Sequence, residues 1–353
     1  MLTDKTVLVT GGTGSLGKVL VRRLLSGEMG KPRKVIVFSR DEAKQHAMRL
    51  SYQRRKAATD EVIYSNLGRT LQFQIGDVCD IHSVSAALRN ADVVFHAAAL
   101  KQVPTCEYFP VEAVQTNILG AENLVRAIRV GKLAVETVVG VSTDKACKPV
   151  SVMGMTKALQ ERLLVCANLD SHGTRFVCVR YGNVLASRGS VIPLFHDQIR
   201  RGGPVTVTSP EMTRFLMSLD HAVDAIYAAL RSARPGEIYV PVVPTARVLD
   251  VAKALVGDRP IQVQVVGIRP GEKIHELLIA EDEVRRSVRR DGYMVIRPLL
   301  PELLGGGGEE EPALDGEYSS ADHLLTLAEL RELLARNGLL VEDAPRFEHE
   351  AVG

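Results

Sequence analysis

"VLVTGGTGSLGKVL", residues 7–20, is the stretch of sequence that decides the fold. An apolar run at 5–10 predicts a buried parallel strand, and a helical pattern follows, with Gly11, Gly14 and Gly17 directly between them. In this context the first glycine permits a tight turn, the second lets a pyrophosphate approach the backbone, and the third allows close helix–strand packing. Because the positive end of the helix dipole lies beside it, this turn predicts a dinucleotide-binding site rather than a merely tight connection.

Strand and helix patterns alternate along the chain up to residue 184. Buried strands are predicted at 34–40, 71–78, 91–99, 136–143 and 174–184. Helical patterns are found at 18–27, 83–90, 117–131 and 151–169. This alternation predicts an α/β fold with a Rossmann-type, doubly wound parallel sheet and helices on both faces.

After about residue 185 the segments become shorter and mixed. We expect residues 1–185 to form the dinucleotide-binding domain. Residues 186–340 are expected to form a smaller C-terminal α/β lobe that covers the carboxyl ends of the strands and contacts the substrate, with room for elements to interleave. The stretch "GGGGEEEP" at 305–312 predicts a flexible loop, and 341–353 a flexible tail.

The composition of the 353 residues indicates a globular protein and excludes several classes. Hydrophobic residues make up 46% and charged residues 24%, and a net charge of +2 argues against nucleic-acid binding through backbone electrostatics. No apolar run approaches the roughly 20 residues of a membrane span, and the start of the chain has no signal-peptide pattern. The five cysteines form no C-x-x-C pair. We therefore expect a cytoplasmic protein without a metal site.

The end of the second predicted strand bears on the choice of cofactor. Ser39 and Arg40 come first and Lys44 is near, and a hydroxyl with two cations suits a 2′-phosphate. NADP is therefore favoured over NAD, although Asp41 could instead face a ribose.

Further cofactor contacts are expected at the ends of the other strands and in the glycine turn. Asp77 and Val78 would flank the adenine, and the small residues before Lys101 leave room for the nicotinamide ribose and diphosphate. The remaining expected contacts are Thr13, Ser15, Leu16, Ala97, Ala98, Ala99 and Asn117.

Six motifs in order carry a resemblance to a known family: "FSRDEAKQ", "HAAALKQVP", "STDKA", "RYGNVLASRGSVIPLF", "MTRF" and "IRPGEKIHE". Together with the glycine turn they resemble the extended short-chain dehydrogenase/reductases. More narrowly, they resemble the UDP-N-acetylglucosamine 4,6-dehydratases of bacterial polysaccharide pathways, from about residue 3 to 335. The resemblance implies a retained NADP-type cofactor, a UDP-sugar substrate and a homo-oligomer, either a dimer or a hexamer. The N-terminal membrane region of the long members is not expected here.

The implied reaction oxidises C4 of the sugar, eliminates water across C5 and C6, and returns the hydride to C6, with inversion expected at C5. Asp144 and Lys145 resemble the pair that serves C5 and C6 in this family. Lys145 would take the C5 proton if desolvation and cations lower its pKa, and Asp144 would protonate O6 if burial raises its own. Thr143 corresponds to a hydroxyl residue that could bond the C4 oxygen, and Lys157 should reach the nicotinamide ribose.

Met153 departs from the usual pattern, in which a tyrosine four residues before the lysine moves a proton. A thioether has no proton to exchange. Met153 either fills the core or faces the substrate, and one branch of the family is similar in having methionine here. The C4 hydroxyl proton must then go to Asp144, Lys145, Lys157 or a water held by Thr143, and these alternatives stay open.

Several residues of the second lobe resemble contacts to a nucleotide sugar. Planar guanidinium groups suit a diphosphate bidentately. The expected substrate contacts are Lys101, Met153, Asn183, Arg188, Arg214, Arg269 and Glu272.

Two rival functions remain. A UDP-sugar C4 epimerase would return the hydride to C4 and would not need an Asp–Lys pair, so "STDKA" favours dehydration. A non-catalytic NADP-binding regulator is suggested by Met153, but such a protein has no reason to keep Asp144, Lys145 and the arginines together.

Overall fold

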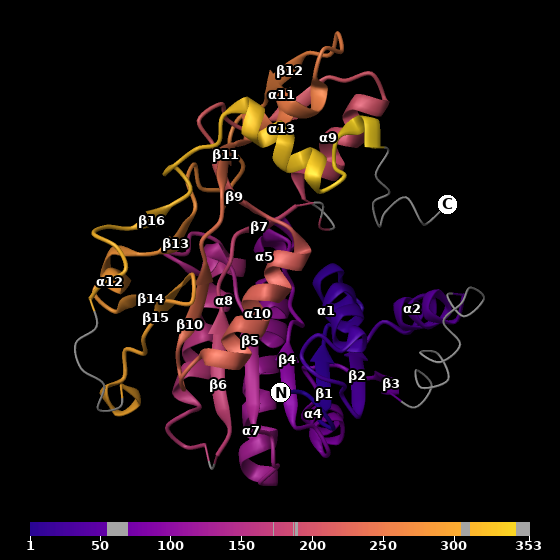
Figure 1. The fold of residues 1–353 in the computed structure, drawn as a ribbon, viewed down its shortest axis with the longest axis vertical. Helices are drawn as coiled ribbons and strands as arrows, with labels where there is room; N and C mark the ends of the chain where they lie inside the picture. Colours follow the sequence, from indigo (N-terminus) through magenta and orange to yellow (C-terminus); the bar gives the residue numbers. More distant parts are fainter. Residues whose placement is uncertain (55–69, 172, 186, 188–189, 305–310, 344–353) are drawn as a thin grey trace.

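The structure is a computed structural model, drawn in Figure 1. It describes residues 1–54, 70–171, 173–185, 187, 190–304 and 311–343. Most of the loop predicted at 305–312 and of the tail predicted at 341–353 lies outside the described residues, as does Arg188.

A nine-stranded sheet forms the centre of the described chain, in the order β14-β15-β10-β6-β5-β4-β1-β2-β3. Seven of these strands, from β10 to β3, run parallel, and β15 and β14 add antiparallel pairs at one edge. The strands are β1 (Thr6–Thr10), β2 (Lys34–Ser39), β3 (Leu71–Ile75), β4 (Val93–His96), β5 (Thr137–Val141), β6 (Arg175–Val179), β10 (Ile238–Pro241), β14 (Ser287–Arg290) and β15 (Tyr293–Ile296). The predicted Rossmann-type fold is therefore confirmed, with the point where the strand order reverses between β1 and β4.

Helices cover both faces of this sheet, which is why every residue of β1 and β4 is buried. On one face, α4 contacts α7 and α7 contacts α8. Helix α10 contacts α1 and strands β5, β6 and β10. Their bounds are α1 (Ser15–Ser26), α2 (Glu42–Arg54), α4 (Ile81–Leu88), α7 (Gly120–Gly131), α8 (Val152–Cys166) and α10 (Leu219–Ser232). Three short segments join β4 to α7, namely α5 (Val103–Tyr108), α6 (Pro110–Ala113) and the π-helix η2 (Val114–Leu119).

The smaller lobe stands over the carboxyl ends of the strands and has its own apolar core, which includes Phe195, Val205, Leu255, Leu330 and Leu334. Its helices are α9 (Val191–Arg200), α11 (Val248–Val256) and α13 (Leu327–Arg336). Its strands are β7 (Asn183–Val184), β8 (Val205–Val207), β9 (Thr213–Met217), β11 (Thr245–Arg247) and β12 (Val263–Val265). Beside the main sheet lie β13 (Leu277–Ile279), α12 (Glu281–Val284) and β16 (Tyr318–Ser319). Short 3-10 turns are η3 (Asp144–Ala146), η4 (Pro301–Leu303) and η5 (Val341–Asp343).

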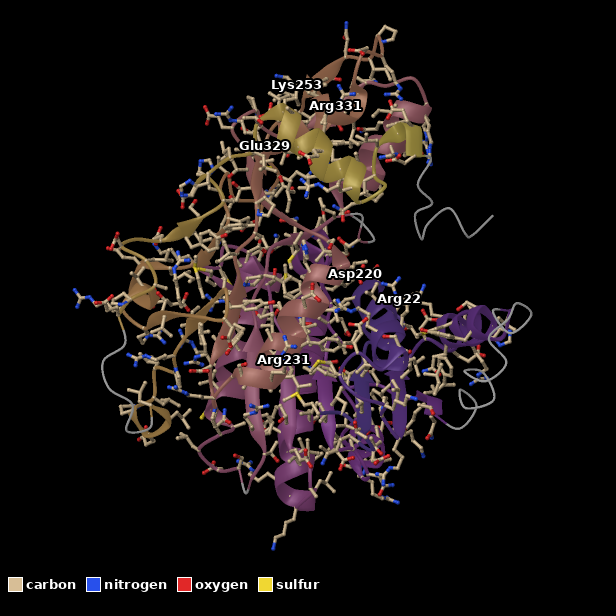
Figure 2. All side chains as sticks on the ribbon, viewed as in Figure 1. Arg22, Asp220, Arg231, Lys253, Glu329 and Arg331 are labelled. Carbon is tan, nitrogen blue, oxygen red and sulfur yellow. The ribbon has the colours of Figure 1, made fainter. Side chains whose placement is uncertain are left out.

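Several elements beyond residue 185 belong to the main sheet and not to the smaller lobe. Strands β10, β14 and β15 return to the main sheet, and α10 packs on its face, where Arg22 of α1 and Asp220 form an ion pair of 2.9 Å. In Figure 2, Lys253, Glu329 and Arg331 mark the smaller lobe at a distance from this pair. The chain therefore leaves the sheet and re-enters it, because apolar strands such as β10 are buried on both faces only within the main sheet.

No helix among the described residues is both long and apolar enough to span a membrane.

Candidate active site

The glycine turn after β1 has the shape that a dinucleotide requires. Gly11 has φ +66°, and a side chain there would lie 2.8 Å from the carbonyl oxygen of Ala97. A Cβ at Gly17 would lie 2.5 Å from the Cα of Gly12, so α1 packs against the turn only without one. Gly14 is the N-cap of α1 and supplies no side-chain cap, and the first turn of this helix carries no acidic residue. The helix N-terminus thus suits an anion such as a pyrophosphate.

A cavity of about 750 Å³ lies along the carboxyl ends of the strands, from the glycine turn to η3. Most of the residues predicted to bind the cofactor line it. These are Gly11, Thr13, Gly14, Ser15, Leu16, Gly17, Ser39, Arg40, Lys44, Asp77, Val78, Ala97, Ala98, Ala99, Lys101 and Lys157. The residues present therefore fit a nicotinamide dinucleotide, whose two nucleotide halves need such a long, continuous groove.

Asn117 does not line this cavity, unlike the other predicted cofactor residues. It is fully buried in η2, where its amide oxygen accepts from the N–H of Leu100 at 2.8 Å. Its amide nitrogen donates to the carbonyl oxygen of Leu100 and to Oγ1 of Thr156, both at 3.0 Å. Asn117 therefore shapes the loop after β4, and its hydrogen-bonding groups are already engaged within the protein.

Two cations lie at the rim of the cavity, where a 2′-phosphate is expected. Nη1 of Arg40 lies 3.4 Å from Oδ2 of Asp77, and Lys44 forms an ion pair with Asp41. Since each cation faces a carboxylate in this arrangement, a phosphate here would compete with those carboxylates for Arg40 and Lys44.

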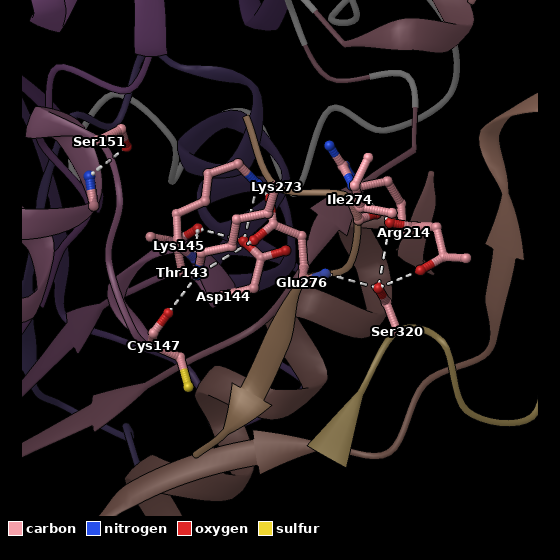
Figure 3. A network of polar contacts seen from close by, with 12 residues as sticks. Thr143, Asp144, Lys145, Cys147, Ser151, Arg214, Lys273, Ile274, Glu276 and Ser320 are labelled. Carbon is pink, nitrogen blue, oxygen red and sulfur yellow. Dashed lines mark hydrogen bonds and ion pairs between the residues drawn. The ribbon is translucent and has the colours of Figure 1, made fainter. Parts of the chain in front are cut away.

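Asp144 and Lys145 lie in η3, directly after β5, at the point where an open parallel sheet holds its reactive groups. Asp144 is completely buried. Its Oδ1 accepts from Oγ1 of Thr143 at 2.8 Å and from Nζ of Lys145 at 3.1 Å (Figure 3). Its Oδ2 is buried and has no hydrogen-bond partner among the described residues, so one oxygen of the carboxylate is unsatisfied within the protein.

Glu276 is a member of this cluster that the sequence did not identify. It immediately precedes β13, its side chain is 2% exposed, and its Oε1 lies 3.3 Å from Nζ of Lys145. Nζ of Lys273 lies 3.9 Å from Oε2 of Glu276. Figure 3 shows Lys145 between the carboxylates of Asp144 and Glu276. The only signal for Glu276 was its place at the end of the motif "IRPGEKIHE".

The charge state of Lys145 differs from the expectation. Desolvation lowers the pKa of Lys145, but the negative charges of Asp144 and Glu276 outweigh it and leave the pKa raised. Arg214 is the nearby cation that opposes them, and its effect is smaller. The condition for Lys145 to act as the base at C5, a lowered pKa, is therefore not met, and Lys145 is an ammonium that can donate a proton.

Lys157 is a buried residue of α8, and its side chain reaches the end of strand β5. Its Nζ donates to the carbonyl oxygen of Val141 at 2.6 Å and to Oε1 of Gln160 at 2.7 Å. Burial lowers the pKa of Lys157 to about 8, against smaller raising effects from Cys178 and Glu161. Lys157 thus fixes the end of β5 next to Thr143, and burial brings its pKa toward neutrality.

Met153 lines the same cavity and packs against Cys106 and Ala113, so it both faces the site and fills a small core. A tyrosine does lie in the cavity, at Tyr181, but burial raises the pKa of its hydroxyl. Burial therefore favours the neutral hydroxyl of Tyr181 over its phenolate.

A second cavity of about 680 Å³ adjoins the first and extends toward the smaller lobe. Lys145, Asn183, Arg269 and Glu272 line both cavities, whereas Arg214 and Glu276 line only the second. Nη1 of Arg214 donates to the carbonyl oxygens of Thr213 and Ile274, which holds the guanidinium at the cavity wall. The predicted substrate contacts, apart from Arg188 outside the described residues, thus line one or both of the two cavities that Lys145 also lines.

Within the described ranges, no group of three or more His, Cys, Asp or Glu residues could hold a metal ion.

Comparisons with known proteins extend over almost the whole chain. Residues 7–298 match the family described as polysaccharide biosynthesis protein. A UDP-glucose 4-epimerase from Rickettsia bellii (strain OSU 85-389) is 42% identical over 344 residues, which is 95% of this chain and 96% of the relative. The structure of Pen from Bacillus thuringiensis is similar with a TM-score of 0.85 and 34% identity, over 96% of this chain and 99% of that one.

A more distant structure shares the fold. DesIV, a dTDP-glucose 4,6-dehydratase from Streptomyces venezuelae with NAD and TYD bound, has a TM-score of 0.63 and 24% identity, over 76% of this chain and 86% of that one. The match over residues 7–298 and the two closely similar full-length relatives agree with the glycine turn, the sheet order and the cluster after β5. The chain therefore belongs to the polysaccharide biosynthesis protein family and is an enzyme of the extended short-chain dehydrogenase/reductase type.

Proposed function

We propose that this protein is a nucleotide-sugar 4,6-dehydratase that converts UDP-N-acetylglucosamine to a UDP-4-keto-6-deoxy-hexosamine with NADP. The observation that carries the proposal is the buried Asp144–Lys145 pair, placed where the cofactor cavity meets the second cavity. The reaction needs proton acceptors and a proton donor on one substrate, and this pair sets a carboxylate and an ammonium side by side. Inversion at C5 is part of the proposal and follows from the family resemblance.

When bound, the nicotinamide accepts a hydride from C4 of the sugar and returns it to C6, so the reaction needs no external reductant. The chain would hold that cofactor with the glycine turn and α1 at the pyrophosphate. Arg40 and Lys44 would lie at the 2′-phosphate that distinguishes NADP from NAD, and Lys157 near the nicotinamide ribose. Arg214 and Arg269 would bind the substrate diphosphate from the second cavity.

The C4 hydroxyl needs a proton acceptor in place of the tyrosine. Asp144 is favoured because its Oδ2 is free of hydrogen bonds, and Thr143 donates to the other oxygen of the same carboxylate. Thr143 thus keeps Asp144 oriented while the hydroxyl proton moves to Oδ2.

A C4 epimerase is the second candidate, since the relative from Rickettsia bellii is named UDP-glucose 4-epimerase. An epimerase returns the hydride to C4 and has no step that uses an acid at O6. The ammonium of Lys145 between two buried carboxylates is therefore better explained by dehydration. The same cluster gives no support to a non-catalytic NADP-binding regulator.

The test is incubation of the purified protein with UDP-N-acetylglucosamine and, separately, with UDP-glucose, followed by proton NMR. A new methyl signal of a 6-deoxy-4-ketose is expected. A simple C4 epimer would establish the epimerase instead, and tight NADP binding without turnover of either sugar would establish the regulator.

We also propose a homo-oligomer. Tyr108, Phe109 and Val111 are exposed around α5 and α6, next to Met155 and Leu159 exposed on α8. A contiguous apolar face of this kind is typical of an interface. Light scattering during gel filtration should give at least twice the mass of 38.5 kDa, and a monomer would contradict the proposal.

A further inference from the structure

Glu276 differs from the other buried glutamates near the site in how its oxygens are used. Glu161 and Glu283 each share two hydrogen bonds with the guanidinium of Arg180, at 2.6 to 2.9 Å. Oε2 of Glu276 is buried with no hydrogen-bond partner among the described residues and lies 3.9 Å from Nζ of Lys273, and Oε1 lies 3.3 Å from Nζ of Lys145. A buried carboxylate that serves only to hold the fold has its oxygens saturated, as Glu161 and Glu283 do.

The backbone of Glu276 is fixed independently of its side chain. Its N–H donates to Oγ of Ser320 at 2.9 Å, and its carbonyl oxygen accepts from the N–H of Ser320 at 2.8 Å. Oγ of Ser320 is in turn bonded to Oγ1 of Thr213 at 2.7 Å (Figure 3). The backbone at Glu276 is therefore held at the wall of the second cavity by hydrogen bonds that do not involve its carboxylate.

The two carboxylates lie on different sides of Lys145. Asp144 lines the cavity that contains the glycine turn, whereas Glu276 lines the cavity that contains Arg214. Lys145 lines both. A sugar that spans the junction would thus present C4 toward Asp144 and its remaining reacting atoms toward Lys145 and Glu276.

We propose that Glu276 is a catalytic residue of the elimination: its carboxylate removes the C5 proton, and the ammonium of Lys145 protonates O6. This inference rests on the proposed function. It gives each of the three proton transfers its own group, with Asp144 at the C4 hydroxyl. The raised pKa of Lys145 agrees with its use as the acid, since an ammonium has no free electron pair with which to take a proton.

The elimination of water is balanced in both protons and electrons. The C5–H bond breaks and its electron pair forms the C5–C6 double bond, while the C6–O bond breaks and its pair leaves on oxygen. The C5 proton goes to Glu276, and a proton from Lys145 goes to the oxygen, which leaves as water. The amine of Lys145 then takes the proton from Glu276, so both groups return to their starting state. The protonation of C5 that follows hydride return to C6 balances the proton that Asp144 took from the C4 hydroxyl. The 4-ketone formed beforehand supplies the acidity at C5, and no further oxidant or reductant is consumed.

The test uses a partial reaction that needs no hydride transfer. The 4-keto-6-deoxy product, made with the wild-type protein, is returned to enzyme in D₂O, and exchange at C5 is followed by proton NMR. Glu276→Gln should slow this exchange at least about 100-fold, the usual loss when a general base is removed. Its binding of UDP-sugar, measured by calorimetry, should not change. Glu281→Gln, which alters an exposed glutamate on α12, is the matched control and should exchange at the wild-type rate.

Each outcome decides the matter. Exchange at the wild-type rate in a folded Glu276→Gln protein would overturn the inference and leave the proposed function standing. If that variant does not fold, Glu276→Asp is the substitute, since it keeps the negative charge but moves the carboxylate oxygens away from the substrate. An unchanged exchange rate in Glu276→Asp would overturn the inference equally. A wild-type protein that makes no methyl product from any UDP-sugar would overturn the proposed function and this inference together.

Discussion

Replacing Arg180 by methionine should destabilise the protein strongly, because it removes the cation that pairs with the buried carboxylates of Glu161 and Glu283. The side chains of Arg180, Glu161 and Glu283 are 3–5% exposed, and the guanidinium also donates to the carbonyl oxygen of Leu278 at 3.0 Å. Breaking one buried ion pair by removing a partner costs about 3–5 kcal/mol. The two pairs share one guanidinium, so we expect about 5 kcal/mol.

The assay is urea denaturation of the wild-type and Arg180→Met proteins, with Arg129→Met as the matched control. Arg129 pairs with Asp170 at 3.5 Å on the surface, and loss of such a pair costs at most about 1 kcal/mol. Adding Glu161→Gln and Glu283→Gln to Arg180→Met should recover more than half of the lost stability, because no charge is then left buried.

The effect should depend on pH in a defined direction. Burial raises the pKa of Glu283, but the charge and hydrogen bonds of Arg180 outweigh it and leave the pKa lowered. The stability contributed by a lowered carboxyl pKa is present above the unfolded value, near 4.5, and is lost as the pH falls through the folded value. The difference between wild type and Arg180→Met should therefore shrink on acidification. A loss below about 1 kcal/mol at pH 7, or a loss that grows toward pH 4, would refute this reasoning.

Four other substitutions test the site. Gly17→Ala should abolish NADP binding measured by calorimetry, since the new Cβ would lie 2.5 Å from the Cα of Gly12; retained affinity would show that α1 can shift without loss. Asp144→Asn should abolish methyl formation in the NMR assay while the protein still binds the UDP-sugar, and full activity would remove Asp144 from the reaction. Arg40→Ser should weaken NADP relative to NAD by at least about tenfold, the equivalent of one charge-assisted contact of about 1.4 kcal/mol; an unchanged ratio would argue for NAD. Met153→Tyr should fold normally, with an unchanged thermal midpoint within about 3 °C, and near-complete unfolding would show that the position is primarily a packing site.

The fold could be predicted because its signals are local. The turn at 11–17 and the alternating strands up to residue 184 depend on neighbouring residues, and the structure confirms the Rossmann-type sheet built from them. The return of β10, β14 and β15 could not be predicted, since these strands resemble those of any mixed lobe. Which sheet they join depends on the partner strands and not on their own composition.

The sequence predicts those residues of the site that lie in recognisable motifs. Asn117 was misplaced because a helical pattern does not show which face of η2 meets the cavity. Glu276 was missed because it lies far from Lys145 in the sequence, and only the folded chain brings the two within 3.3 Å. A lowered pKa of Lys145 was a condition for its use as the base at C5, and the sequence could not show the second carboxylate, Glu276, that helps to raise that pKa.

The hydrogen bonds between Glu276 and Ser320 have a consequence for how the protein is made. The groove that suits the cofactor is built from residues between Gly11 and Lys157, which leave the ribosome in the first half of synthesis. The opposite wall closes only when Ser320 pairs with the backbone at Glu276 and Thr213. A chain that ends before Ser320 would therefore lack the hydrogen bonds that fix the backbone at Glu276.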